Sequence, residues 1–70
     1  MTNKSYVFGD NKLNELFKFD LNDEVEIKLN SMYKVVAPLG KGAFSRVISM
    51  IEKQSGILWA VKILEKERFS

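Results

Sequence analysis

The sequence predicts a mainly β fold, and three observations in its second half support this prediction. Residues 58–64 form an apolar run with a single central charge, which is typical of a strand in a sheet. Apolar pairs at positions 35–36 and 47–48 indicate two further strands with apolar groups on both faces. A turn with two glycines lies between those pairs, as expected for a hairpin. We therefore expect an antiparallel sheet with an N-terminal extension.

The chain is small. Seventy residues make at most one small domain, which buries only about 60% of its unfolded surface. Because there are no cysteines and no histidines, disulfides are excluded and a zinc site is not expected. A sheet that is apolar on both faces needs cover on both, and we expect neither cover here. The prediction is exposed apolar surface, with self-association through the open faces.

The first element that could bind a ligand is the glycine turn. A backbone that approaches phosphate oxygens needs residues without a Cβ, and Gly40 and Gly42 meet this need and can also adopt positive φ. Amides between them can donate to phosphate, as in an anion-binding nest. Phe44 can cap the turn, while Leu39 and Val47 can cover a flat base. Taken alone, the turn indicates no more than a hairpin.

The second element is a lysine inside the apolar run 58–64. Alternation along a strand places Lys62 on one face with the small Ala60, and Trp59 and Val61 on the other. An ammonium group in such a run is costly to desolvate unless an anion meets it. An edge strand that uses lysine against aggregation is the alternative explanation. The spacing of 22 residues after Gly40, and the room beside Ala60, favour a lysine that reaches a phosphate.

Together the turn and the lysine resemble the opening of a eukaryotic-type serine/threonine protein kinase domain. The resemblance runs from residue 33 to about residue 69 and is strongest to calmodulin-dependent and phosphoinositide-dependent kinases. It implies strands at 33–39, 46–52 and 57–64 with a turn at 53–56, which is an incomplete N-terminal lobe of three antiparallel strands. Ser45 stands where the family has a third glycine, and Pro38 predicts that the first strand lies at an edge.

The resemblance implies ATP as the ligand. The turn would cover the phosphates, Leu39, Val47 and Ala60 would enclose the adenine, and Lys62 would contact the α- and β-phosphates. The expected cofactor-binding residues are Leu39, Gly40, Lys41, Gly42, Ala43, Phe44, Ser45, Arg46, Val47, Ala60 and Lys62.

The residues that perform phosphoryl transfer in that family have no counterpart here. The family holds its lysine with a glutamate from a later helix and uses further aspartate and asparagine side chains for the proton and for magnesium. The only acids after Lys62 are Glu65 and Glu67, and a strand would direct Glu65 to the opposite face. We therefore expect no catalytic or metal-binding residue and no activity from these residues alone. Magnesium and a protein substrate belong to the complete kinase.

The first thirty residues differ from the rest in charge. They carry four basic and six acidic residues, net −2, whereas residues 31–70 carry seven and three, net +4. This shift predicts an extension at 1–30 and a truncated kinase lobe at 31–70. Alternation at 17–21 and 25–29 predicts a short hairpin in the extension, and a helix over 11–19 is the alternative. The extension is either a docking or regulatory segment or a mostly solvated leader held by a few apolar contacts.

Two other functions remain open beside the kinase fragment: a small β interaction module and a nucleotide binder without catalysis. The sequence has no signal peptide, no myristoylation glycine and no apolar stretch that could span a membrane, so a cytoplasmic or nuclear protein without a membrane partner is predicted. A net charge of +2 is small, and its basic residues are not interleaved with stacking aromatics. A nucleic-acid partner is therefore not expected.

Overall fold

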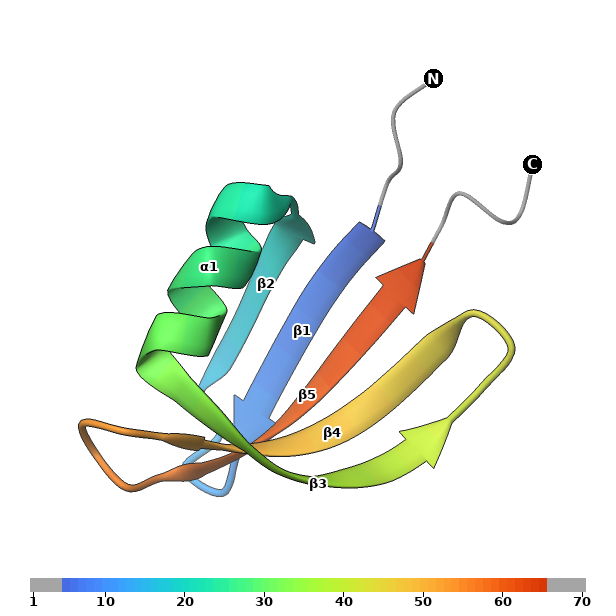
Figure 1. The fold of residues 1–70 in the computed structure, drawn as a ribbon. Helices are drawn as coiled ribbons and strands as arrows, with labels where there is room; N and C mark the ends of the chain where they lie inside the picture. Colours follow the sequence, from blue (N-terminus) through green and yellow to red (C-terminus); the bar gives the residue numbers. More distant parts are fainter. Residues whose placement is uncertain (1–4, 66–70) are drawn as a thin grey trace.

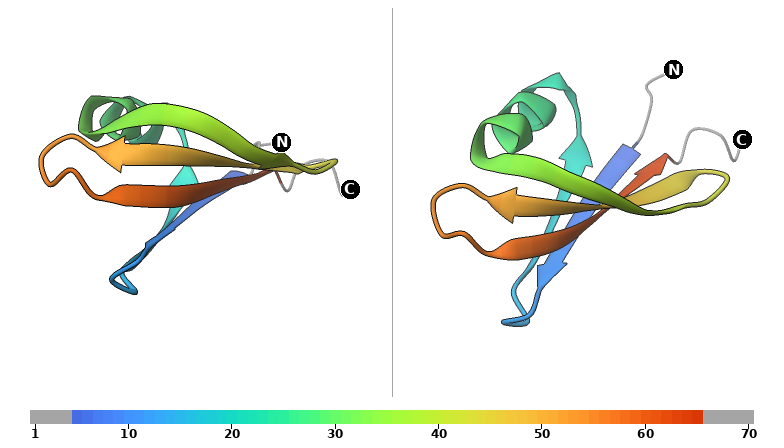
Figure 2. Two further views of the ribbon diagram at one scale, coloured as in Figure 1. Left: turned by 90° about the horizontal axis from the view of Figure 1, so that it is seen from below. Right: turned by 60° about the horizontal axis from the view of Figure 1, so that its bottom comes forward.

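The computed structural model describes residues 5–65, with side chains for residues 5–64, and shows a five-stranded antiparallel sheet with one helix (Figure 1). The strands lie in the order β2-β1-β5-β4-β3, so β1 from the N-terminal extension pairs with β5 from the apolar run. The sheet is strongly twisted, and β1 and β2 cross the direction of β3 and β4 at a steep angle (Figure 2). In chain order the elements are β1 Ser5–Asn11, β2 Leu16–Leu21, α1 Asp23–Met32, β3 Tyr33–Lys41, β4 Ser45–Glu52 and β5 Leu58–Glu65.

The prediction of a mainly β chain is confirmed, and so are the three strands of its second half. The third of them begins at Leu58, one residue later than expected, after the turn that Gly56 closes with a φ of 75°. Pro38 lies in β3, which is an outermost strand, beside an irregularity in the β3–β4 register. A residue without an N–H is tolerated at such a position. The predicted number of strands in the sheet is wrong, because the extension adds β1 and β2 to the three strands expected.

The prediction of a hairpin between residues 17–21 and 25–29 is wrong in its second strand. Residues 17–21 do form a strand, but they pair with β1, and residues 25–29 lie in α1. Asn22 begins this helix by accepting a hydrogen bond from the Val25 amide (2.9 Å), and acidic residues occupy the first turn. Val25 and Leu29, one turn apart, face the core, whereas Ile27 is 69% exposed. The apolar spacing from Val25 to Leu29 is therefore that of a helix face, although residues 25–29 also alternate like a strand.

The alternative of a helix over residues 11–19 is also wrong, since a tight turn joins β1 to β2 there. Asn11 Oδ1 accepts hydrogen bonds from the amides of Leu13 (2.9 Å) and Glu15 (3.2 Å). Asn14 adopts a φ of 61°, a conformation that asparagine tolerates better than most residues. These side-chain contacts to the backbone compete with helix formation and close the hairpin instead.

The core lies on the face of the sheet that α1 covers, which we call the inner face. Its buried residues come from four strands, so the extension is not a solvated leader within the described residues. Val25 and Leu29 of α1 pack against this core, so the expectation that neither face has cover is wrong for the inner face. The predicted exposed apolar surface is confirmed by Leu16, Leu39 and Leu58, which are between 50% and 77% exposed. The buried core residues are Val7, Tyr33, Met50, Trp59 and Val61.

Stability should decline at alkaline pH because of Tyr33. Burial raises the pKa of its phenol above the ordinary value of 10.0, and the charges of Glu52 and Glu15 raise it further. The folded chain then retains the phenolic proton at a pH where the unfolded chain has lost it, so the free energy of unfolding falls as pH rises above about 10. Urea denaturation of wild type and Tyr33→Phe across this range should show a smaller decline in the variant. Parallel declines would contradict this assignment.

Candidate functional site

One row of residues crosses all five strands on the face opposite the core, which we call the open face. In register, Gly40 pairs with Val47, Val47 with Lys62, Lys62 with Phe8, and Phe8 with Lys18. The next row on the same face passes through Ala60, which pairs with Asp10. Three predicted site residues, Val47, Ala60 and Lys62, thus lie on adjacent positions of the sheet.

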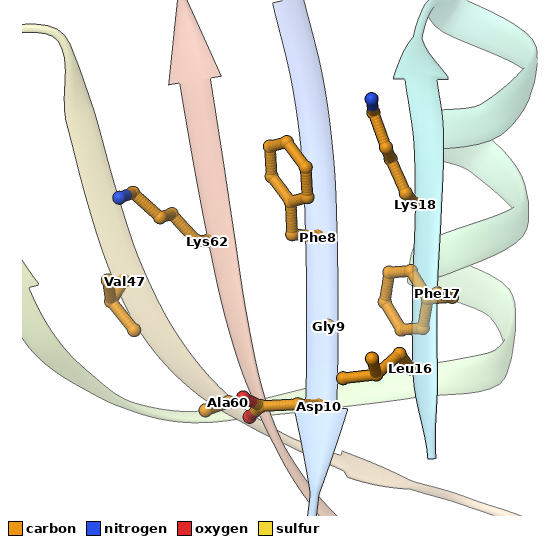
Figure 3. Close-up of a pocket in the computed structure, with 9 residues that line it drawn as sticks. All are labelled: Phe8, Gly9, Asp10, Leu16, Phe17, Lys18, Val47, Ala60 and Lys62. Carbon is orange, nitrogen blue, oxygen red and sulfur yellow. The ribbon is translucent and has the colours of Figure 1, made fainter. Parts of the chain in front are cut away.

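A hollow of about 650 Å³ opens over the middle of these rows (Figure 3). Lys62, Ala60 and Val47 form one side of it, and residues of the β1–β2 hairpin form the other. Because Ala60 has a small side chain, it leaves space on the sheet for a flat group. The residues that line the hollow are Phe8, Gly9, Asp10, Leu16, Phe17, Lys18, Val47, Ala60 and Lys62.

Leu39 lies in an adjoining hollow of about 310 Å³, next to Ala60. Asp10 and Ala60 line both hollows. All three residues predicted to enclose a base, Leu39, Val47 and Ala60, therefore lie around one position of the open face. Along β5, the exposed Ala60 and Lys62 alternate with the buried Trp59 and Val61, as predicted for this strand.

The rest of the glycine turn, residues 41–46, lies elsewhere. These residues line a third hollow of about 420 Å³ together with Ser5, Leu21 and Ile63. Residues 41–46 and Lys62 are thus not brought into one site in this structure. Within the turn, the Gly42 amide donates to the Ser45 carbonyl oxygen (2.6 Å). The predicted site residues found in this third hollow are Lys41, Gly42, Ala43, Phe44, Ser45 and Arg46.

The expected conformation of the turn glycines is corrected by the structure. Neither Gly40 nor Gly42 has a positive φ, and Gly56 is the glycine of residues 5–65 that does. A Cβ added at Gly40 would meet nothing within 4 Å, so neither backbone conformation nor packing requires glycine there. Glycine inside a strand weakens it and often marks a place where a ligand or another backbone approaches closely. Gly40 is thus a candidate for close approach rather than for a special φ.

Charge is distributed unevenly over the open face. Lys62 is exposed and forms no ion pair with any side chain of residues 5–64. The ammonium group of Lys18 lies over the rings of Tyr6 (5.3 Å) and Phe8 (5.6 Å), an arrangement that favours a cation. The Asp10 carboxylate lies by Ala60 (Figure 3).

Sequence reasoning missed the contribution of β1 and β2 to this face. Phe8, Asp10 and Lys18 were not among the expected site residues. The run of aromatic and β-branched residues at 6–8 favours a strand and could have indicated β1. Gly9 and Asp10, which are both uncommon in strands, interrupt that signal.

Similarity to known proteins does not identify the kind of site on the open face. No family model, no curated protein and no solved structure matches the chain. In the part of the chain that the structure describes, no group of three acidic, histidine or cysteine side chains is placed to hold a metal ion. No helix of residues 5–65 has the length and apolar character to cross a membrane.

Proposed function

We propose that this chain binds ATP on its open face, as the nucleotide-holding N-terminal part of a serine/threonine protein kinase. The observation that carries the proposal is the row formed by Gly40, Val47 and Lys62, with Ala60 beside it. These are residues that the kinase resemblance assigns to ATP, and they come from three different strands. Phosphoryl transfer itself would require acidic residues from elsewhere in a complete kinase.

Lys62 provides the positive charge of the proposed site. An exposed ammonium group at the edge of an apolar hollow attracts a phosphate, and a charge-assisted contact of this kind contributes about 1.5–3 kcal/mol. Val47 and Ala60 offer an apolar surface to a purine, with Leu39 at its far side. Because Gly40 has no side chain, a ligand can approach the backbone of β3 closely. Together these features suit a molecule with a flat apolar end and an anionic end.

The remaining residues of the turn have a secondary role in this proposal. The Gly42 amide is already bonded to Ser45, so Lys62 is the main phosphate contact. To cover the phosphates, the tip of the turn at Phe44 would have to bend towards the open face. The flexible backbone at Gly42 would permit such a movement.

Isothermal titration of MgATP tests the proposal. Lys62→Met should raise the Kd about 10- to 100-fold, because it removes the cation and retains an apolar stem. Gly42→Val should also weaken binding, since it stiffens the turn and adds bulk to it. Lys28→Met, on the exposed side of α1, is the matched control and should bind MgATP like wild type. Equal affinities in all four proteins, or no binding by wild type, would refute the proposal.

A second candidate function, an interaction module, is favoured by one observation. Val35 and Val36 are 53% and 56% exposed on β3, an outermost strand of the sheet. Exposed apolar residues on an edge strand invite pairing with another chain. This function predicts oligomers in sedimentation velocity that Val35→Lys disrupts and that Lys62→Met leaves intact. A monomer at all concentrations would count against it.

A further inference from the structure

We infer that the β1–β2 hairpin supplies the second half of the ATP site, with Lys18 as a second phosphate-binding cation and Asp10 as an acceptor for the ribose hydroxyls. This inference rests on the proposed function and extends it to residues outside the kinase-like segment. No part of the resemblance assigns a role to either residue. Both line the hollow that also contains Lys62 and Ala60.

Two lysines lie on the open face, on either side of Phe8. Lys62 and Lys18 belong to the same row, and Phe8 between them pairs with both. In Figure 3 the Phe8 ring stands between the two lysine side chains, on the same side of the sheet. Two ammonium groups on either side of one aromatic ring can contact different oxygens of a triphosphate. A single point charge would leave much of that charge unmatched.

Lys18 is held by two aromatic rings. Its ammonium group lies 5.3 Å from the centre of the Tyr6 ring and 5.6 Å from that of Phe8. These contacts restrict a long and otherwise flexible side chain to the open face. Because part of the conformational entropy is already lost, less is lost when an anion binds. Lys18 is thus partly preorganised for a ligand in this hollow.

The opposite end of the hollow is acidic. Asp10 lies two residues from Phe8 along β1, a separation of roughly 7 Å in a strand. The Asp10 carboxylate lies beside Ala60, and no side chain of residues 5–64 pairs with it. A carboxylate accepts hydrogen bonds from hydroxyl groups and repels phosphate. The hollow therefore has a negative end by Ala60 and a positive end by Phe8.

This polarity orients the ligand. The sugar hydroxyls, which donate hydrogen bonds, belong at Asp10, and the phosphates belong at Lys62 and Lys18. The purine then lies over Ala60, between Val47 and Leu39. An inverted nucleotide would place phosphates against a carboxylate, which is unfavourable.

The test compares Lys18→Met and Asp10→Asn with two controls, Lys28→Met on α1 and Asp20→Asn on β2. Asp20 is an exposed aspartate of the same hairpin that does not line the hollow. The probes are MgATP, its 2′,3′-dideoxy analogue, tripolyphosphate and adenosine, measured by isothermal titration. Circular dichroism verifies that each variant folds, which we expect because all four substituted side chains are exposed.

Each variant has its own expected pattern. Asp10→Asn should weaken MgATP about tenfold, leave the dideoxy analogue unchanged and leave tripolyphosphate no weaker, so the preference for ribose is lost. Lys18→Met should weaken both MgATP and tripolyphosphate about tenfold and leave adenosine unchanged. A loss of fold would weaken all four probes together. These differences separate ligand contacts from structural effects.

The failures of the two proposals are distinguishable. If Lys62→Met weakens MgATP while Lys18→Met or Asp10→Asn behaves like its control, the inference about the hairpin is overturned and the proposed function stands. If wild type binds neither MgATP nor tripolyphosphate, both are overturned. If both hairpin variants give their expected patterns, the site extends over all five strands.

Discussion

Replacing Trp59 by alanine is expected to remove a large part of the free energy of unfolding. Trp59 is 7% exposed, and its ring centre lies 5.2 Å from that of Phe17 and 6.0 Å from that of Tyr33. Removing a buried tryptophan costs about 3–5 kcal/mol. A domain of this size has a total stability of about 3.5–10 kcal/mol, so the variant should lose between about a third and all of it. Urea denaturation followed by far-ultraviolet circular dichroism measures the loss.

Trp59→Phe is the matched control for this experiment. It retains an aromatic ring between Phe17 and Tyr33, and it removes an indole N–H that has no hydrogen-bond partner among the described residues. Because a buried donor without a partner is itself unfavourable, part of the lost packing is offset. We expect this variant to fold and to lose less than the alanine variant. A denaturation midpoint of Trp59→Ala close to that of wild type would disprove the central role of this residue.

Gly9→Val is the second substitution with a large expected effect. Gly9 is buried on β1 and pairs with Phe17 on β2, whose ring lies directly over it. A Cβ at this position would overlap the Phe17 ring, so the ring must move away from Trp59 and Tyr33. Overpacking of this kind costs about 3 kcal/mol. The free energy of unfolding in urea should fall by that amount.

Two further variants separate this overlap from a general effect of side chains at glycine. Gly40→Ala adds a Cβ that meets nothing within 4 Å, and the stability should remain close to that of wild type. Phe17→Ala removes the ring that causes the overlap. In the double variant with Gly9→Val, the combined loss should be smaller than the sum of the two single losses. Additive losses would show that the ring is not the obstacle.

The sequence allowed β3, β4 and β5 to be predicted because each feature of that half acts locally. The alternation around Lys62 fixes which side chains face the core, and the turns at 42–44 and 53–56 fix the strand pairing. No long-range information was needed to obtain this three-stranded part. These three strands alone do not show that β5 will pair with a further strand on its free side. That strand is β1, whose residues lie 48 to 60 positions from their partners in β5.

The extension was harder to predict because its signals conflict. Residues 25–29 alternate like a strand, yet the Asn22 cap and the acidic first turn favour a helix. In β1, Gly9 disfavours a strand in sequence, but the structure uses it to seat Phe17. Gly9 leaves space for the Phe17 ring, and the residues next to Gly9 in the sequence do not indicate this requirement. As a result, α1 was assigned incorrectly as a strand, and β1 was missed.

The candidate site was predictable on the side that comes from β3, β4 and β5. Val47, Ala60 and Lys62 were expected on one face and do lie together. The location of the turn was not predictable from its own residues, since the hollow that it lines also includes Ser5 and Leu21 of the extension. Phe8, Asp10 and Lys18 could not be included without the register of β1 against β5. That register is set by the whole sheet and not by any motif.

The pairing of β1 with β5 also determines how the chain must fold. Ser5 lies opposite Glu65, sixty residues away, at the middle of the sheet. The neighbouring strands β3, β4 and β5 can pair through short turns, but β1 must close a loop almost as long as the chain. Loop closure of this length carries an entropic cost before any contact is gained, and such topologies fold slowly. We therefore expect the β1–β5 pair to form last, after the β1–β2 hairpin and the three-stranded β3–β4–β5 part.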